Sequence, residues 1–190
     1  MYTPPIQDQK FVLEYLIGFD SIVQQLSMNG QKPEEIDKDL IWSILDEAGK
    51  FASTVLAPIN HTGDQQNSTI TEEGYVRTPD GFKEAYRAMC EAGWTTLEAK
   101  SEWGGQQMPM SVSAAVCEMW HSANMSFALC HLLSQGQIYA LQKSASQEQK
   151  ETYLPNLVSG KWTGTMNLTE PQAGTDLSKI RTKAVREGDH

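Results

Sequence analysis

The apolar residues of this chain recur at steps of three and four over most of its length. This spacing gathers side chains on one face of a helix. The first such run predicts a helix over residues 8–28, with Asp8 as its N-cap and Asn29-Gly30 as its stop. Its expected buried face consists of Val12, Leu16, Phe19, Val23 and Leu26.

A second run predicts a helix that begins after Pro33-Glu34-Glu35, because proline and acidic residues suit a first helical turn. This helix is expected to end at Pro58. The polar residues 59–80 contain Gly63, Gly74 and Pro79 and predict a long surface loop. The expected buried face of the helix consists of Leu40, Ile41, Ile44, Leu45, Ala48, Phe51, Ala52 and Val55.

Four more helical patterns follow along the chain. They predict helices over residues 82–92, from about Pro109 onward, over 126–143 and over 147–158. Pro155 is expected to distort the second half of the last helix. Together with the first two helices they predict a mainly α fold, with a helical domain of six helices over residues 1–159.

The period of the pattern changes after residue 160. Residues 161–169 alternate between apolar and small polar side chains, and residues 180–186 alternate more weakly. A period of two is typical of strands. Residues 160–190 therefore predict the start of a β domain. Because two strands alone are marginally stable, we interpret the chain as a fragment of a longer protein.

Composition excludes several classes of function. The formal net charge of −9 comes without a cluster of Lys or Arg, which argues against a nucleic-acid partner. Cys90, Cys117 and Cys130 share no CxxC spacing, and the four histidines have no metal-ligand spacing, so we expect neither disulfides nor a metal site. No signal peptide and no apolar stretch long enough to span a membrane is present. We expect a cytoplasmic protein.

The segment from Thr165 to Asp176 carries the candidate chemistry. Thr169 and Thr175 offer hydroxyl donors, and Gly174 allows a ligand to approach the backbone closely. A flat heterocycle or a pyrophosphate could use such groups. The residues alone nevertheless favour an ordinary polar hairpin turn over a ligand site.

The end of this segment resembles the flavin-site signature of the acyl-CoA dehydrogenase family. The resembling run is Leu168-Thr169-Glu170-Pro171-Gln172-Ala173-Gly174-Thr175-Asp176. Upstream, Trp103-Gly104-Gly105-Gln106 is similar to a glycine loop of the family, and the layout of six helices matches its N-terminal domain. The opening Tyr2-Thr3-Pro4-Pro5 is similar to the longer bacterial branch of methylmercaptopropionyl-CoA dehydrogenase-like enzymes. Asn167 and Lys179 depart from the family's pattern at the edges of the motif.

The resemblance implies an FAD site. Backbone groups around Met166 and Leu168, together with the Thr169 hydroxyl, would contact the isoalloxazine of FAD. Gly174 would belong to the same site, and Thr175 would lie near the cofactor pyrophosphate and the acyl-CoA. The family's catalytic base lies in a C-terminal helical domain, so no catalytic residue is expected in this chain. Glu170 is expected to be structural.

The implied function is α,β-dehydrogenation of an acyl-CoA thioester to the trans-2-enoyl-CoA by the parent protein, with the fragment alone inactive. The implied partners are the acyl-CoA substrate, electron-transferring flavoprotein as electron acceptor, and further copies of the parent chain. Two alternatives remain open. One is an acyl-CoA oxidase, which passes its electrons to oxygen. The other is a helical interaction module without redox chemistry, which gives no reason for the motif in residues 168–176.

Overall fold

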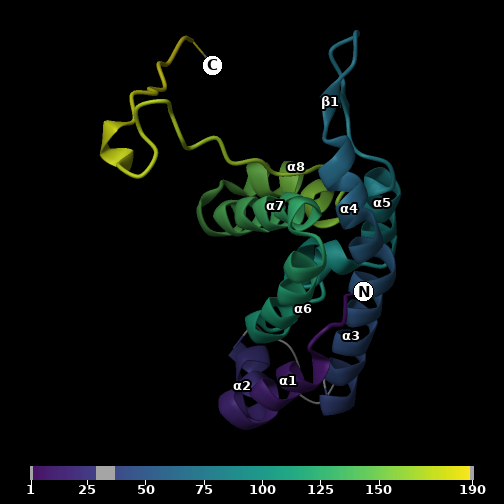
Figure 1. Cartoon of the computed structure of the whole chain (residues 1–190). Helices are drawn as coiled ribbons and strands as arrows, with labels where there is room; N and C mark the ends of the chain where they lie inside the picture. Colours follow the sequence, from purple (N-terminus) through teal and green to yellow (C-terminus); the bar gives the residue numbers. More distant parts are fainter. Residues whose placement is uncertain (1, 29–36, 189–190) are drawn as a thin grey trace.

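Helices make up most of the computed structural model, which describes residues 2–28 and 37–188. Figure 1 shows a helical body from which two segments project: a narrow hairpin labelled β1 and a long C-terminal arm in yellow. The mainly α fold predicted from the periodicity is confirmed. The predicted stop at Asn29-Gly30 and the predicted start at Pro33-Glu34-Glu35 lie outside the described residues.

The N-terminal helix is continuous but changes its winding. It comprises α1 (Ile6–Phe11), a π-helical segment (Val12–Gly18) and α2 (Phe19–Met28). It begins before Asp8, which lies in the first turn and is not the N-cap. The predicted buried face is wrong in part, because Leu16 is 70% exposed whereas Leu13 and Ile22 are buried. Phe19 of the predicted face does pack against the core. The wider π-helical winding rotates the side chains away from the register that a regular helix would give them.

The second helix runs further than predicted. It comprises α3 (Lys38–Phe51), a π-helical segment (Ala52–Leu56) and α4 (Ala57–Gln66). The Asp37 side chain caps its start by accepting a hydrogen bond from Leu40 N at 2.8 Å. The helix continues through Pro58, which follows the π-helical segment, where the wider hydrogen bonding joins Ala57 N to Ala52 O.

The predicted surface loop over residues 59–80 is likewise wrong in part. After α4 the chain forms a short antiparallel hairpin, β1 (Thr69–Ile70) and β2 (Val76–Arg77), with Ile70 opposite Val76. Both of these side chains are exposed. In Figure 1 the hairpin stands out from the end of the body at which α4 and α5 lie.

The remaining helices follow the sequence pattern closely. They are α5 (Phe82–Glu91), α6 (Met110–Ala123), α7 (Met125–Ser144) and α8 (Gln147–Val158). Asn124 caps α7, and a capping box of Ser146 and Gln149 starts α8. The helix α8 continues through Pro155 to its end. Short 3₁₀ turns at Trp94–Thr96 and Ser101–Trp103 connect α5 to α6.

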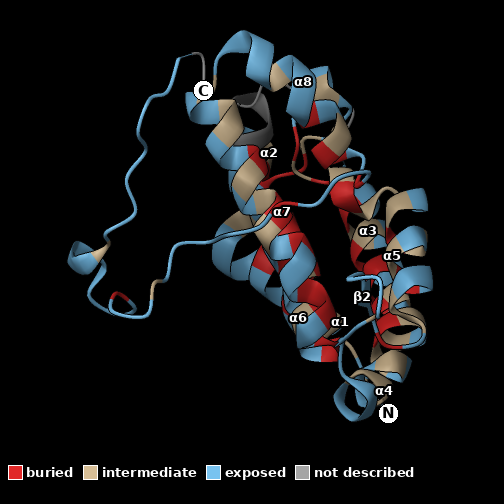
Figure 2. Ribbon diagram, turned by 90° about the horizontal axis from the view of Figure 1, so that it is seen from above, coloured by how far each residue is buried: buried red, intermediate tan, exposed pale blue. Residues whose placement is uncertain are grey.

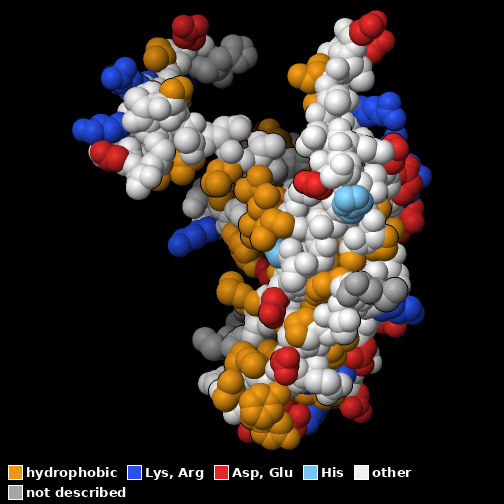
Figure 3. All heavy atoms as spheres, viewed as in Figure 1, with side chains coloured by type: hydrophobic (Ala, Val, Ile, Leu, Met, Phe, Trp, Pro, Cys, Tyr) orange, Lys and Arg blue, Asp and Glu red, His pale blue; other side chains and the backbone are white. Residues whose placement is uncertain are grey.

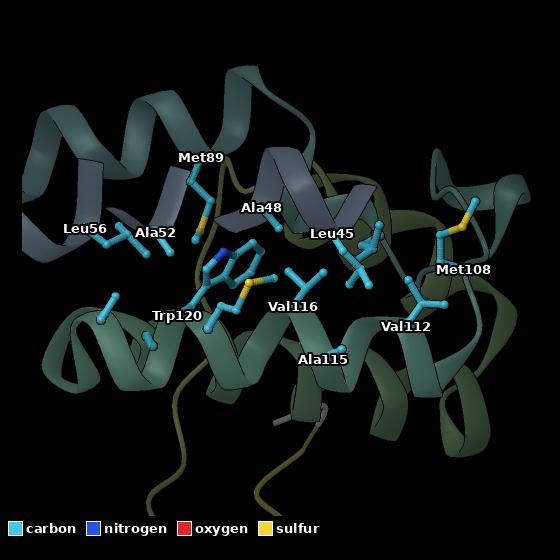
Figure 4. Close-up of a cluster of buried hydrophobic side chains, with 14 of the residues drawn as sticks. Leu45, Ala48, Ala52, Leu56, Met89, Met108, Val112, Ala115, Val116 and Trp120 are labelled. Atoms are coloured by element: carbon cyan, nitrogen blue, oxygen red, sulfur yellow. The ribbon is translucent and has the colours of Figure 1, made fainter. Parts of the chain in front are cut away.

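The core lies where α3 and its π-helical extension pack against α6. Trp120 on α6 is 1% exposed, and its ring makes edge-on contacts with Phe51, Trp94 and His131. Figure 4 shows Trp120 between the two helical layers, facing Met89 and Ala52. Figure 2 shows the same division, with buried faces of the helices turned toward one another. Burial of a tryptophan of this kind contributes a large share of a core's stability.

The glycine loop before α6 has a steric explanation. A Cβ on Gly105 would lie 1.8 Å from the carbonyl oxygen of Ala99, which no side chain can tolerate. The loop is closed by backbone hydrogen bonds, including Gln107 N to Ala99 O at 3.0 Å and Met108 N to Leu97 O at 2.8 Å. Gly105 therefore allows the chain to cross itself at close range before it enters α6.

The strands predicted at 161–169 and 180–186 do not form in this structure. Both segments are extended, and neither forms a strand pair in the described chain; an isolated bridge joins Glu170 and Ala173, which lie between them. A strand needs the backbone groups of a neighbour, and the described residues offer none along this arm.

Candidate functional site

The arm that carries the candidate motif is fixed to the helical body at its base. Tyr86 Oη donates a hydrogen bond to Gly160 O at 2.9 Å, and Gly164 N donates to Ser134 Oγ on α7 at 3.0 Å. A Cβ on Gly164 would lie 2.4 Å from Gln137 Oε1 and 3.0 Å from Ser134 Cα. Glycine at this position therefore lets the arm lie directly on α7.

Beyond Gly164 the arm folds on itself. Within the described chain, the hydrogen bonds of residues 165–188 join one residue of the arm to another. In Figure 2 the arm crosses over α7 and then leaves the helical body. The candidate site is thus a self-contained turn at the end of an extended segment.

Glu170 holds this turn together. Its backbone N–H donates to Ala173 O at 3.2 Å, and Ala173 N donates back to Glu170 O at 3.0 Å. Its carboxylate accepts hydrogen bonds from Arg181 N at 3.0 Å and from Thr182 N at 2.9 Å. The Thr182 hydroxyl and the Gln172 side-chain amide also donate to it. The carboxylate therefore closes the loop between the turn and the following extended segment.

These hydrogen bonds also determine the protonation of Glu170. The bond from the Thr182 hydroxyl, followed by those from the backbone N–H groups of Arg181 and Thr182, lowers the pKa of Glu170 from 4.5 to about 2. A general base works best with a pKa near the operating pH. Glu170 is therefore arranged as a structural anion and is a poor candidate for a base.

Asp176 has a similar structural part in the turn. Its carboxylate accepts hydrogen bonds from Ser178 N at 3.1 Å and Ser178 Oγ at 2.6 Å, which starts the 3₁₀ turn Leu177–Lys179. Both carboxylates of the motif are thus used within the turn itself.

The residues proposed from the sequence to bind the cofactor are all on the surface of the arm. Met166 is 66% exposed and Leu168 is 44% exposed, and Thr169, Gly174 and Thr175 are also exposed. The hydroxyls of Thr169 and Thr175 have no hydrogen-bond partner among the described residues. A Cβ on Gly174 would meet no atom within 4 Å. The turn thus presents two hydroxyls and open backbone beside apolar side chains.

The sequence did not reveal two parts of this site. The pairing of Glu170 with Thr182 joins residues 12 apart and has no periodic signal. The contact of Gly164 with α7 is the second, because the alternation of residues 161–169 predicts only a strand position for Gly164. A glycine among the apolar positions of a strand pattern was the available sign of a close approach.

Comparison with known proteins decides the family. Residues 42–161 match the family model described as acyl-CoA dehydrogenase, N-terminal domain. The chain belongs to the acyl-CoA dehydrogenase family. The family membership inferred from the sequence is thereby confirmed, whereas the motif at residues 168–176 lies beyond the matched range.

Among relatives in this family, the chain is 42% identical over 188 residues to 3-methylmercaptopropionyl-CoA dehydrogenase from Ruegeria pomeroyi. This match covers 99% of the chain but only 31% of the relative. The chain therefore spans about a third of the length of this curated acyl-CoA dehydrogenase.

Solved structures show the same fold. Butyryl-CoA dehydrogenase from Megasphaera elsdenii matches with a TM-score of 0.60 and 24% identity, over 77% of this chain and 36% of that one. An acyl-CoA dehydrogenase complexed with FAD from Bacillus anthracis matches with a TM-score of 0.58 and 22% identity, over 83% of this chain and 24% of that one. At these identities the likeness establishes the fold.

Two further findings concern the described residues alone. They contain no group of three or more His, Cys, Asp or Glu side chains placed to hold a metal ion. None of the helices in the described ranges has the length and apolar character to cross a membrane.

Proposed function

We propose that this chain is part of an FAD-dependent acyl-CoA dehydrogenase that converts an acyl-CoA thioester to its trans-2-enoyl-CoA. Residues 1–159 would form the N-terminal helical domain, and residues 160–190 would begin the β domain. The proposal rests on family membership and on the 42% identity to a relative named as an acyl-CoA dehydrogenase. It also includes a cytoplasmic location, which the three free cysteines Cys90, Cys117 and Cys130 favour.

The observation that carries the proposal is the hydrogen bonding of the motif turn. Glu170 and Asp176 are used internally, whereas the hydroxyls of Thr169 and Thr175 remain exposed and available. A turn stabilised by its own carboxylates can present donors to a ligand without rearranging. The residues therefore fit one wall of an FAD site: Met166, Leu168, Thr169, Gly174 and Thr175.

In this proposal bound FAD supplies the acceptor for the hydride that leaves the substrate. The residues of this chain would bind FAD and the acyl-CoA and orient them. The Thr169 hydroxyl and the backbone around Met166 and Leu168 would donate hydrogen bonds where negative charge develops. Such stabilisation of developing charge is usually the largest single contribution to catalysis. Thr175 would donate to the pyrophosphate or to the acyl-CoA. Hydrogen bonds lower the pKa of Glu170 to about 2, which makes it a poor base. By the family resemblance, proton removal would fall to a residue of the C-terminal helical domain.

The proposed partners follow from the same reading. They are the acyl-CoA substrate, electron-transferring flavoprotein as the electron acceptor, and further copies of the parent chain.

The test uses the complete protein that contains this chain, purified and mixed with acyl-CoA thioesters without air. Bleaching of the flavin absorbance and one equivalent of enoyl-CoA per flavin are expected. Admission of air then separates the alternatives, since an oxidase recovers its flavin colour quickly and a dehydrogenase recovers it slowly. A complete protein that carries no flavin and dehydrogenates no thioester would contradict the proposal and favour the interaction module.

A further inference from the structure

A pocket separate from the motif turn lies where the base of the hairpin meets α5 and α7. Its volume is about 680 Å³, within the range of about 300–1,000 Å³ that is usual for small-ligand sites. Thr163, at the start of the arm, closes one side. The lining includes Phe82, Lys83 and Tyr86 from α5 and Phe127 from α7.

The pocket contains a pair of aromatic rings. Phe82 on α5 and Phe127 on α7 meet edge to face, with ring centroids 5.8 Å apart. Phe127 is 5% exposed, so this ring is fixed by the core. Phe82 also lies directly against α4, because a Cβ on Gly63 would come within 2.7 Å of its Cζ atom. An apolar ligand body could rest on the accessible part of Phe82, which Phe127 supports from the core, without the protein ordering new side chains.

The walls of the pocket are also held in place. Asp80 N donates to Gln66 Oε1 at 2.8 Å, and Gln66 Nε2 donates to Asp80 Oδ2 at 3.0 Å, which ties the base of the hairpin to α4. On the other side, Tyr86 donates to Gly160 O. The Tyr86 hydroxyl is protonated at neutral pH and can donate, and burial raises its pKa further.

The charge of the lining is opposite to that of the protein. The chain carries a formal net charge of −9, yet among the lining residues Lys83 is the one with a charge, and no carboxylate is present. Lys83 forms no ion pair with a described residue and is exposed at the rim. Hydroxyl groups line the rest of the rim: Ser68, Thr78, Ser126 and Thr163. An acidic ligand would therefore find a cation and hydroxyl donors around an apolar floor.

We propose that this pocket binds a small apolar monocarboxylate. Its aromatic or branched body would lie on Phe82 and Phe127, and its carboxylate would pair with Lys83. The site is distinct from the proposed FAD wall, since it shares no residue with Met166–Thr175 and needs no cofactor.

Titration of the 190-residue chain with 2-naphthoate, followed by amide NMR, tests the proposal. Shifts are expected for Phe82, Lys83 and Phe127. Lys83→Gln is expected to weaken 2-naphthoate binding about fivefold, the upper end for an exposed ion pair, and to leave the neutral 2-naphthalenemethanol unaffected. Arg87→Gln, one turn further along α5 and outside the lining, is the matched control and should change neither affinity.

A second variant tests the location independently of charge. Thr163→Trp would fill the mouth of the pocket and should abolish the shifts caused by both compounds, while the amide spectrum of the helical body stays native. Equal affinity of wild type and Lys83→Gln for 2-naphthoate would overturn the proposed carboxylate contact. Shifts that persist in Thr163→Trp, or that map only to other surfaces, would overturn the site.

Discussion

The carboxylate of Glu170 binds both the backbone N–H of Thr182, at 2.9 Å, and its hydroxyl, at 2.5 Å. This contact joins the motif turn to a segment 12 residues further along the chain. It keeps the turn folded although the arm projects from the helical body (Figure 1). The exposed hydroxyls of Thr169 and Thr175 are thereby presented by a turn that has its own internal support.

The turn should open in acid. The pKa of Glu170 is lowered from 4.5 to about 2, so the carboxylate stabilises the turn above pH 4.5, and this stabilisation is lost as the pH falls toward 2. The amide resonance of Thr182 should move over that interval. In Glu170→Gln it should show no such movement and should resemble an unfolded position already at pH 7. If the Thr182 amide resonance of the wild type did not move between pH 4.5 and pH 2, the contact would be disproved.

The attachment of the arm to α7 should depend on Gly164. In Gly164→Ala the new Cβ would collide with Gln137 and with the backbone of Ser134, so the arm must move from α7. Faster hydrogen exchange is expected for the Gly164-position amide, which donates to Ser134 Oγ. Gly136→Ala is the control. Gly136 lies on α7 itself, a Cβ there would meet no atom within 4 Å, and the exchange of the Gly164 amide should stay unchanged.

The stability of the helical body should depend on pH through His131. This ring is 4% exposed beside Trp120, and burial, with a smaller contribution from His121, lowers its pKa from 6.5 to about 4. Between these values the unfolded chain binds a proton that the folded chain does not. The free energy of unfolding should therefore fall as the pH drops from about 6.5 to about 4.

Urea denaturation at a series of pH values measures this dependence. His131→Phe should flatten it, because the buried titrating group is removed, whereas His61→Gln, at an exposed position, should retain the slope of the wild type. A wild-type stability that is constant between pH 6.5 and pH 4 would mean that His131 is not the buried neutral ring described here.

Much of the fold was predictable because it depends on local signals. The pattern over residues 147–158 predicts α8 with the bounds that the structure gives it, since a capping box starts that helix. The π-helical segments at Val12–Gly18 and Ala52–Leu56 were not predictable, because a period of 3.6 residues is assumed in reading helical faces. That assumption misplaced the buried face of the first helix. The end predicted for the second helix at Pro58 came instead from the usual effect of proline inside a helix.

The unpredicted burial pattern leaves apolar side chains on the surface. Phe11, Tyr15 and Leu16 are more than half exposed, and Figure 3 shows hydrophobic side chains gathered at the end of the molecule where Figure 1 places α1 and α2. The strands predicted after residue 160 show a second limit of prediction from a local pattern. Alternation indicates a tendency to pair, but pairing depends on partners that a local pattern does not contain.

The candidate site was identified through family resemblance and not through spacing alone. Composition favoured a polar turn at residues 168–176, and the structure indeed has a turn there. The residue types alone did not separate Glu170, which binds Arg181 and Thr182, from Thr169, which is exposed; the family resemblance assigned them different roles. Their different parts follow from contacts between segments that are distant along the chain.

The isolated chain should bind FAD weakly. The arm offers one wall of a site, and tight sites usually bury about 70% or more of a ligand. Addition of FAD to residues 1–190 should therefore leave tryptophan fluorescence nearly unchanged at micromolar concentrations. Submicromolar binding by this chain alone would mean that the FAD wall has been misplaced.

The most direct test of the proposed FAD wall uses the complete protein carrying Thr169→Val. Two quantities are measured: the flavin content, as the ratio of flavin to protein absorbance after gel filtration, and the rate of flavin reduction. Loss of a hydrogen bond to a developing charge is expected to lower FAD affinity or the reduction rate by about tenfold to a hundredfold. Thr165→Val, on the same arm but outside the proposed wall, should retain the flavin content and rate of the wild type. A Thr169→Val protein that matches both wild-type values would contradict the proposed cofactor site.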